Sequence, residues 1–353
     1  MKHLILLGAG QAHLQLLRTQ ASMPLPGVQL TLLAPHPHQL CAAMLAGFVA
    51  GHYALEDCTI ALAPLLKHGA VDWLTRSATE VDANARRITL EDGSEIGYQW
   101  LSIDTGPVQP RALIEKSLPG AREHGLFVRP LENFATLWPR VVELAASRPL
   151  RVAVIGGGAT AIELAMAIRQ RLPDTSVSLI TGLTQVGANY PPAVRQRVLQ
   201  ALKQRCITLL PELAVGIGAA EVFLKNGARL ACDVPLIAMG SQAPPWLVNS
   251  GLALDQNGYA AVDAFQRSIS HPHVFATHDA SVKTGAALAS NVRADLAGIQ
   301  PQTHLAPASR LHWVPCGSHF AIAGCGKYAA QGRWAWRLKD WLDRSHLQRW
   351  RHG

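Results

Sequence analysis

The sequence lacks most of the features that mark exported or membrane-spanning chains. Only six of its 353 residues are cysteine, and no two form a Cys-x-x-Cys pair, which argues against a zinc ribbon and a thioredoxin-type motif. No stretch of 18 residues is free of charge and of Gly, Pro or His, whereas a membrane span needs about 20 apolar residues. The N-terminal apolar run ends at Gly8, too early for a signal-peptide core. We expect a cytoplasmic protein, either free or peripheral on the cytoplasmic membrane face.

Charged residues and hydrolytic motifs are also scarce. Only 16% of residues are charged and 49% are hydrophobic, which excludes global disorder, and the length predicts about two domains. The net charge of +8 favours anionic ligands. The basic residues do not interleave with an RNA- or DNA-binding module, so we expect no nucleic-acid partner. Gly-x-Ser-x-Gly, His-Glu-x-x-His and Walker lysine motifs are absent, which leaves a hydrolase or kinase unsupported.

Metal binding also lacks a complete ligand set. The segments 36–38 and 271–273 each read His-Pro-His, which puts two imidazoles on one side of an extended chain. No carboxylate or cysteine completes either pair, so we expect no metal site.

The chain does contain one strand–turn–helix–strand pattern twice. The first copy predicts a strand at 4–7, a helix at 12–20 and a strand at 28–33. The second predicts a strand at 151–155, a helix at 159–171 and a strand at 177–180. Such units imply parallel sheets, so the predicted fold class is α/β with two Rossmann-like dinucleotide-binding domains. Further strands are expected at 79–90 and 98–103, with a hairpin turn at 91–94, and at 234–239 and 274–276.

The glycine turns of both copies have the spacing of dinucleotide-binding sites. In the first turn, Gly8 permits a tight turn and Gly10 lets backbone N–H groups approach a pyrophosphate. The third position, usually Gly or Ala, is His13. The second turn has Gly156, Gly158 and Ala161 at these positions. Two turns imply two nucleotides, most economically FAD and NADH or NADPH.

The acidic residue that reads the ribose is missing after the second strand of both units. The first of these strands is followed by Ala34 and the second by Thr181. No arginine replaces the acid at either position, so the choice between NADH and NADPH stays open.

With these motifs, nearly the whole chain resembles the two-dinucleotide-fold flavoproteins of the pyridine nucleotide-disulfide oxidoreductase superfamily. It looks most like the type II NADH dehydrogenase-like branch, including members associated with selenide, water dikinase. Besides the two glycine turns, the resemblance rests on the segments 43–47, 101–106, 271–276, 332–334 and 339–341.

The resemblance implies a division of the chain and a set of cofactor-binding residues. A discontinuous FAD domain would span 1–115 and 255–305, an inserted NAD(P)H domain 116–254, and a C-terminal segment 306–353. The residues expected at FAD are Gly8, Gly10, His13, Thr105, Gly106 and Asp279, and those expected at NAD(P)H are Gly156, Gly158 and Ala161. The family reads Gly-Asp where this chain has His278-Asp279.

No side chain is an obvious acid or base, and hydride transfer from nicotinamide to flavin requires none, because the cofactors carry the redox chemistry. The candidates for a catalytic role are Cys41, Glu163 and Thr284. Cys41 lies where disulfide reductases have a Cys-x4-Cys pair, but the partner position is Ala46, so no internal dithiol is expected and Cys41 is either a single redox thiol or an inert buried one. Glu163 is either a helix-face residue or a gate near the nicotinamide. Thr284 stands where the branch often has Gln.

The leading hypothesis is electron transfer from NAD(P)H through flavin to a quinone-like or other small acceptor. A second hypothesis keeps FAD without NAD(P)H, as an oxidase or dehydrogenase acting on a small metabolite or a sulfur or selenium compound. A third is a non-enzymatic flavin-binding protein. Reduction of the bound flavin by NADH or NADPH separates the first from the others.

The C-terminal tail differs sharply in composition from the rest of the chain. From Gly326 onward it holds seven Lys or Arg against two Asp, and four of the nine tryptophans. Trp334, Leu338, Trp341 and Leu342 share one helical face. Basic residues beside Trp and Leu predict a helix on an anionic membrane surface. The alternative is a helix that packs on the protein's own core or on a second subunit of a homodimer.

Overall fold

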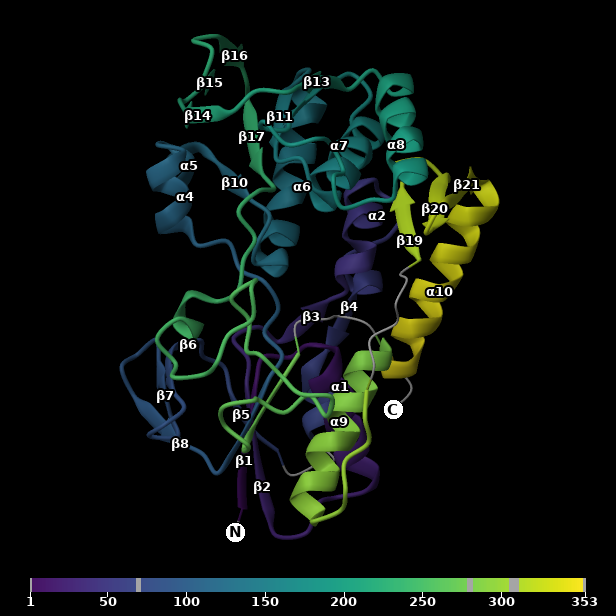
Figure 1. Cartoon of the computed structure of the whole chain (residues 1–353). Helices are drawn as coiled ribbons and strands as arrows, with labels where there is room; N and C mark the ends of the chain where they lie inside the picture. The colour runs from purple at the N-terminus through teal and green to yellow at the C-terminus, as the bar shows by residue number, and fades with distance from the viewer. Residues whose placement is uncertain (1, 68–70, 278–281, 305–310, 352–353) are drawn as a thin grey trace.

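The computed structural model describes residues 2–67, 71–277, 282–304 and 311–351. It contains two parallel sheets, one in the lower half of the molecule in Figure 1 and one in the upper half. The lower sheet uses strands from both sides of the upper one in the sequence, as expected for a domain inserted into another. The domain limits given above remain a prediction.

The first sheet is parallel throughout and has the order β18-β9-β1-β2-β5. Its strands are β1 (Lys2–Leu7), β2 (Val28–Leu33), β5 (Val71–Leu74), β9 (Trp100–Ile103) and β18 (Val274–Ala276). Helices α1 (Gln11–Ser22) and α9 (Val282–Ala297) pack side by side and share one apolar core with this sheet. The first predicted unit is therefore confirmed.

The second sheet is also parallel and has the order β10-β17-β11-β12-β13. Its strands are β10 (Leu126–Phe127), β11 (Arg151–Ile155), β12 (Ser176–Ile180), β13 (Thr208–Leu210) and β17 (Val234–Ile237). The helices of this half are α6 (Leu131–Ser147), α7 (Ala159–Arg171) and α8 (Pro192–Gln204). The strand at 151–155 and the helix at 159–171 have the predicted bounds.

Within the described part of the chain, four small antiparallel sheets accompany the parallel ones, and two of them are three-stranded and lie between strands of the parallel sheets in the sequence. One consists of β6 (Ala78–Asp82), β7 (Arg87–Leu90) and β8 (Glu95–Gly97), and the other of β14 (Ala214–Ile217), β15 (Glu221–Leu224) and β16 (Arg229–Ala231). The prediction of one strand over 79–90 was wrong. The Asp82 carboxylate accepts the backbone N–H groups of Asn84 and Ala85, and Arg86 has a positive φ of 54°, so the chain turns there.

The hairpin turn at 91–94 is present, but its partner strand differs from the expectation. The turn joins β7 to β8, whereas Trp100–Ile103 forms β9 in the middle of the first parallel sheet. A strand bonded on both sides is buried on both faces, and Leu101 and Ser102 are fully buried.

The remaining short elements are distributed over both halves of the molecule. They are β3 (His38–Leu40), η1 (Ala42–Met44), α2 (Leu45–Val49), η2 (Glu56–Cys58), β4 (Thr59–Ala61), α3 (Leu62–Lys67), α4 (Arg111–Ser117), α5 (Ala121–His124) and η3 (Pro245–Leu247). Helix α2 packs against α7, so a segment of the first half enters the core of the second.

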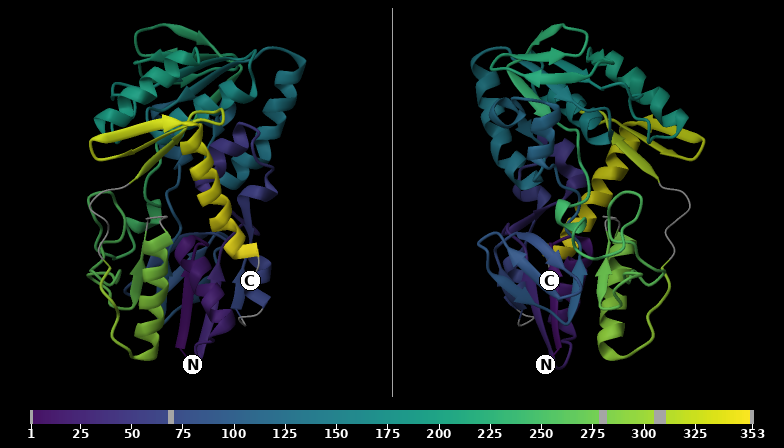
Figure 2. Two further views of the ribbon diagram at one scale, coloured as in Figure 1. Left: turned by 90° about the vertical axis from the view of Figure 1, so that its right-hand side faces the viewer. Right: turned by 60° about the vertical axis from the view of Figure 1, so that its left-hand side comes forward.

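The C-terminal segment spans both halves of the molecule. It forms β19 (His312–Pro315), β20 (Ala321–Cys325), β21 (Tyr328–Gly332) and the 19-residue helix α10 (Arg333–Arg351). Figure 2 shows α10 running from the upper half down to the N-terminal half, where Leu347 and Trp350 enter the first core. Within the described ranges, no helix is both long and apolar enough to cross a membrane.

Candidate functional site

The first glycine turn connects β1 to α1 beneath the end of β9. Gly8 has φ 94°, and a Cβ atom there would lie 2.5 Å from the backbone oxygen of Asp104. Only glycine fits both the left-handed backbone and this close approach. The turn therefore depends on Gly8 for its shape, independently of any ligand.

The Asp104 side chain lies over the N-terminus of α1. Its Oδ2 accepts the backbone N–H of Ala12 at 2.8 Å, and a Cβ atom at Gly10 would lie 2.2 Å from the same carboxyl group. The residue is 6% exposed, and burial raises the pKa of its carboxyl group to about 7, against the opposing effect of the N–H groups of Ala12 and His13. A group that titrates near neutrality thus occupies the position where an anion would meet α1.

His13, predicted to flank a pyrophosphate, points into the protein. Its Nδ1 lies 2.6 Å from the Gly8 carbonyl oxygen and its Nε2 lies 2.8 Å from the Ser102 hydroxyl. The side chain is fully buried, and burial lowers its pKa to about 4, so the ring is neutral at pH 7. Because a carbonyl only accepts, Nδ1 donates to it and Nε2 accepts from Ser102. His13 fixes the turn against β9.

A cavity of about 390 Å³ begins at this turn and follows the carboxyl ends of β1 and β2. Its wall includes Gly8 and Ala34, which is the position where the ribose-reading acid was missing. Three arginines, Arg76, Arg111 and Arg129, and one acid, Glu132, also line it. The cavity therefore lies at the strand ends and has more cationic than anionic side chains in its wall, as suits a dinucleotide.

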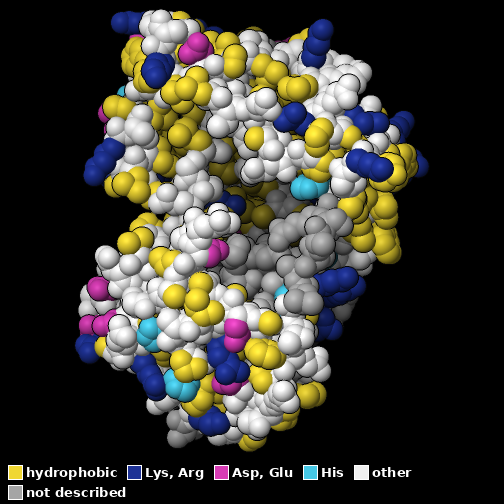
Figure 3. Space-filling view, in the orientation of Figure 1, with side chains coloured by type: hydrophobic (Ala, Val, Ile, Leu, Met, Phe, Trp, Pro, Cys, Tyr) yellow, Lys and Arg dark blue, Asp and Glu magenta, His cyan; other side chains and the backbone are white. Residues whose placement is uncertain are grey.

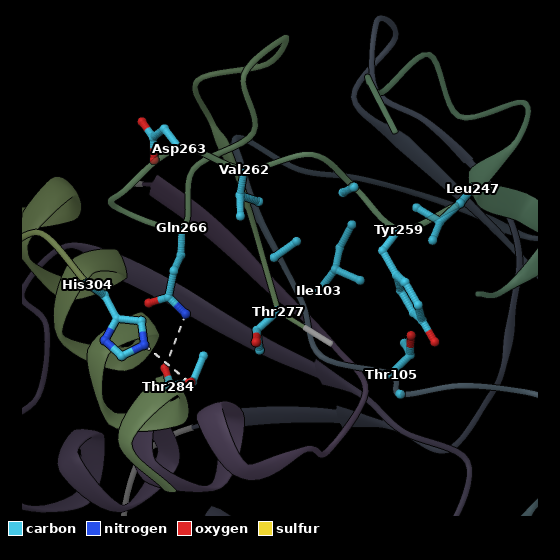
Figure 4. Close-up of a pocket in the computed structure, with 13 residues that line it drawn as sticks. Ile103, Thr105, Leu247, Tyr259, Val262, Asp263, Gln266, Thr277, Thr284 and His304 are labelled. Atoms are coloured by element: carbon cyan, nitrogen blue, oxygen red, sulfur yellow. Dashed lines mark hydrogen bonds between the residues drawn. The ribbon is translucent and has the colours of Figure 1, made fainter. Parts of the chain in front are cut away.

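Thr105 and Gly106 follow β9, and both line a second cavity of about 230 Å³. Figure 4 shows Thr284 and His304 on one side of this cavity and Tyr259 on the other. The Thr284 hydroxyl is 3.2 Å from His304 Nε2, and its backbone oxygen accepts from the Gln266 amide at 3.2 Å. Thr284 is thus held in place on this wall, while Asp279, also predicted at FAD, lies outside the described residues.

The second glycine turn repeats the backbone of the first. Gly156 has φ 145°, and a Cβ atom there would lie 2.8 Å from the backbone oxygen of Ala238, which follows β17. Ala161 is fully buried beneath the turn. At Gly158, by contrast, a Cβ atom would meet nothing within 4 Å. This turn leaves its second glycine open to a ligand.

Cys41 and Glu163, two catalytic candidates far apart in the sequence, share the electrostatic surroundings of Lys339 and Asp343 on α10. Lys339 Nζ donates to Asp343 at 2.5 Å and to the Ala43 carbonyl at 2.7 Å. Burial raises the pKa of Glu163 to about 7, although the Lys339 charge opposes this shift. Cys41 and Glu163 therefore share the same two charged neighbours, whereas Thr284 lies in the wall of the cavity of about 230 Å³.

Cys41 also has a cysteine neighbour that the spacing argument did not find. Its backbone N–H donates to the Cys58 carbonyl at 2.8 Å, one step beyond the β3–β4 ladder. Burial raises the pKa of Cys41 to about 11 and that of Cys58 to about 12, so both are thiols at pH 7. Both are free cysteines, and Cys58 is the residue directly before β4.

Sequence reasoning missed Asp104, Lys339 and Asp343 as site residues. Asp104 carried a signal, since an acid directly after a buried strand beside a glycine turn meets that turn at the sheet's carboxyl edge. Lys339 and Asp343 gave no local signal, because their place depends on how α10 docks. Within the described ranges, no group of three or more His, Cys, Asp or Glu is arranged to hold a metal.

The chain is similar to a known protein family and to several known proteins. A model of the family described as pyridine nucleotide-disulphide oxidoreductase matches residues 2–295. An NADH dehydrogenase-like protein of Mycobacterium tuberculosis is 27% identical over 285 residues, covering 77% of this chain and 66% of the relative. The demethylphylloquinone reductase of Synechocystis is 26% identical over 226 residues, covering 61% and 55%. This chain thus spans less than two thirds of either relative.

Solved structures share the fold over the full chain. The sulfide:quinone oxidoreductase of Aquifex aeolicus superposes with a TM-score of 0.78 at 18% identity and covers 100% of this chain and 92% of its own. The NDH2 of Plasmodium falciparum, solved with NADH, gives 0.75 at 13% identity, with 98% of both chains covered. At these identities the likeness shows the two-domain α/β fold alone.

Proposed function

We propose that this chain, which belongs to the pyridine nucleotide-disulphide oxidoreductase family, transfers electrons from NADH or NADPH through FAD to a quinone-like acceptor. The observation that carries the proposal is the pair of glycine turns. Each places the N-terminus of a helix of at least 12 residues at the carboxyl edge of a parallel sheet. Such an N-terminus binds a diphosphate, so two turns in one chain support two dinucleotides.

FAD is assigned to the first turn because the cavity of about 390 Å³ starts there and has the right charge. Arg129 and Arg111 line this cavity and would supply positive charge to an anionic ligand, and Thr105 lies in the same wall. Gly106 stays a predicted FAD residue beside it, in the wall of the second cavity. Arg76 is held by Asp92 at 2.7 Å, at the rim. Asp279 stays a predicted FAD residue by resemblance.

The nicotinamide nucleotide is assigned to the second turn. The open space at Gly158 lets a ligand approach the backbone N–H groups at the start of α7. Thr181 follows β12 and is 4% exposed, with neither an acid nor an arginine at this position. Nothing here rejects a 2′-phosphate, so we expect NADH and NADPH to bind with similar affinity.

The bound cofactors would supply the redox chemistry, and the chain would supply position and proton control. Glu163, whose pKa is raised to about 7 by burial, can hold or release a proton near neutrality beside Lys339. A quinone takes up protons when it is reduced, so this carboxyl group suits such an acceptor. The Synechocystis relative is named a demethylphylloquinone reductase and the Aquifex relative a sulfide-quinone reductase, which supports the same class of acceptor.

The visible spectrum of the purified protein tests this function. We expect flavin absorption that bleaches under anaerobic conditions on addition of NADH or NADPH and returns on addition of a short-chain quinone. Glu163→Gln should keep the flavin spectrum and slow the return. Flavin that dithionite reduces but neither nicotinamide reduces would favour direct oxidation of a small metabolite. Protein without flavin would contradict the proposal.

We also propose that α10 attaches the protein to an anionic membrane surface. One face of the helix is buried, with Ala335 fully covered and Lys339 9% exposed. The predicted apolar face points outward: Trp334 is 52% exposed and Trp341 62%, and Leu338 and Leu342 are 41% exposed. Figure 3 shows hydrophobic side chains gathered on the flank over α10, with basic side chains near both ends. Such a face on one side of a docked helix suits the interfacial region of a bilayer.

Liposome flotation tests this attachment. The full-length protein should float with vesicles of mixed phosphatidylserine and phosphatidylcholine and less with phosphatidylcholine alone, since each basic residue near the surface contributes roughly 1 kcal/mol. The double variant Trp334→Ser/Trp341→Ser should remain in the aqueous fraction. Leu183→Ser removes a more exposed apolar side chain elsewhere, at 72%, and should float as before. A wild-type protein that stays unbound and dimerises through α10 would contradict the membrane assignment.

A further inference from the structure

The first glycine turn carries an anion of its own. Asp104 Oδ2 accepts the N–H of Ala12, in the first turn of α1, at 2.8 Å, and the carboxyl group fills the space above Gly10. The N–H groups of a helix's first turn are the donors that bind an external phosphate, because they have no partner within the helix. The Asp104 carboxyl group therefore competes with a bound dinucleotide for the N–H group of Ala12.

The fold does not require this acid. The backbone N–H of Asp104 bonds to the Leu7 oxygen at 2.9 Å, and that of Ala238 bonds to the Ile155 oxygen at 2.9 Å. The two residues thus occupy the same place, one after the strand beside each glycine turn. In the second half this position is Ala238, whose side chain is a methyl group. The carboxyl group of Asp104 is therefore a property of the first turn alone.

Ionised Asp104 and a diphosphate are incompatible neighbours. Two anions close together in a buried site repel each other more strongly than in water. Protonation removes the repulsion and converts the carboxyl group from an acceptor into a hydrogen-bond donor that can face a phosphate oxygen. The protonated form is thus the form that tolerates the ligand.

We propose that Asp104 couples dinucleotide binding at the first turn to the uptake of one proton, so that FAD binds together with a protonated Asp104 carboxyl group. This inference rests on the proposed function, since it takes the ligand of the first turn to be FAD. Asp104 would then make the affinity for FAD depend on pH: high at acidic pH, and lower as the pH rises.

The surroundings of Asp104 support a transition near neutrality. Burial raises the pKa of its carboxyl group to about 7 before any ligand is present, and a nearby diphosphate would raise it further. His13, the titratable neighbour on α1, is neutral at pH 7 and turned toward Gly8 and Ser102. The titratable and charged groups in the adjoining cavity wall are His36, Glu132 and three arginines, Arg76, Arg111 and Arg129, and Lys283 at the start of α9 is exposed. The arginines stay charged throughout the range of interest.

FAD release from the full-length protein tests the proposal. The holoprotein is diluted into buffers from pH 5.5 to 9, and free FAD is measured by its fluorescence to give a dissociation constant at each pH. For one coupled proton, the constant should rise by up to tenfold per pH unit above neutrality. Titration calorimetry at pH 8 in two buffers of different ionisation enthalpy should show the uptake of about one proton per FAD.

Asp104→Asn keeps the shape and supplies a neutral donor, so it should bind FAD with little pH dependence and without proton uptake, and tighter than wild type at pH 8–9. Asp104→Ala should also lose the pH dependence. Asp72→Asn, which changes an exposed acid of the same sheet bonded to Gln29, should behave as wild type. Circular dichroism verifies that each variant is folded.

The outcomes distinguish the role of Asp104 from the proposed function. Wild-type FAD affinity that stays constant from pH 5.5 to 9, or an Asp104→Asn protein that keeps the wild-type pH dependence, overturns the role of Asp104 and leaves the proposed function intact. A protein that binds no FAD at any pH overturns both.

Discussion

Gly8 and Gly156 occupy the same structural position in the two halves of the molecule. Both have positive φ angles, and at both an added Cβ atom would collide with the backbone oxygen of the residue that follows the neighbouring strand, Asp104 in one half and Ala238 in the other. The repeated geometry shows that this glycine belongs to the strand–turn–helix connection itself. Its conservation between the halves says nothing about which ligand each turn receives.

The next residues of the two turns differ in what they offer a ligand. Gly10 lies beneath the Asp104 carboxyl group, whereas Gly158 faces open space. The third position is a buried, hydrogen-bonded His13 in the first turn and a buried Ala161 in the second. The comparison separates two tasks that one sequence motif combines: the first glycine shapes the turn, and the side chain from the adjacent strand sets the charge that a phosphate meets.

Alanine at the first glycine should harm both turns by the largest amount. We expect Gly8→Ala and Gly156→Ala each to lower the free energy of unfolding by about 2–5 kcal/mol, the sum of a strained left-handed backbone and a clash with a fixed carbonyl. Urea denaturation measures the loss. Gly93→Ala is a matched control, because Gly93 has φ 81° but its Cβ position is open, so it should cost about 1–2 kcal/mol. Equal losses at all three positions would contradict the close approach.

Asp104 should make the stability of the first half depend on pH. Its pKa is about 7 in the folded protein and has a reference value of 3.8, so between pH 4 and 7 the folded state holds a proton that the unfolded state has lost. The free energy of unfolding therefore falls as the pH rises through this window and levels off above it. Asp104→Asn lacks this contribution, so its stability relative to wild type should rise by about 2–4 kcal/mol from pH 4 to 7.

The difference between these two proteins isolates Asp104 from its neighbours. His13, whose pKa is lowered to about 4, contributes in the opposite direction, since its unfolded state binds more protons between pH 4 and 6.5. Glu163, with a pKa raised to about 7, contributes in the same direction as Asp104. Both are present in wild type and variant and cancel. Urea denaturation of cofactor-free protein at several pH values gives the difference, and a flat difference would show that Asp104 is ionised in the fold.

The second glycine should separate the two turns by a smaller amount. Gly10 has an ordinary φ of −67°, so Gly10→Ala costs only its clash with the Asp104 carboxyl group, about 1–3 kcal/mol of stability. Gly158→Ala should stay within about 0.5 kcal/mol, because the space is open, and should weaken nicotinamide binding instead. In an Asp104→Ala background, Gly10→Ala should become nearly neutral. A double-mutant cycle by urea denaturation that shows no coupling would mean that the two residues do not meet.

The predictions from sequence succeeded where the signal was local. Both βαβ units were found within about two residues of their bounds, because strand, turn and helix follow one another within some 30 residues. The outward face of α10 was also predicted, since helical periodicity alone groups Trp334 with Trp341. These features depend on neighbours along the chain.

The missed features depend on which strands and helices become neighbours in space. Asp104 reaches Ala12 only because β9 pairs with β1, across 92 residues of sequence. Cys58 meets Cys41 through the β3–β4 ladder, and Lys339 reaches Ala43 only once α10 has docked. Knowing the strand order would have found Asp104 and Cys58, whereas the place of Lys339 requires the packing of the C-terminal helix.

A smaller effect, on binding instead of stability, is expected from giving the second turn the acid of the first. Ala238→Asp places a carboxyl group after β17, at the position equivalent to Asp104, and the space above Gly158 is free to receive it. If this acid position sets the charge that a phosphate meets, the affinity for NADH should fall by about tenfold at pH 8, or roughly 1.4 kcal/mol, and recover at pH 6. Ala238→Asn, of the same size but neutral, should bind NADH equally at both pH values. Titration of NADH against the two proteins measures this, and identical pH profiles would mean that the first turn's acid acts through surroundings that the second turn lacks.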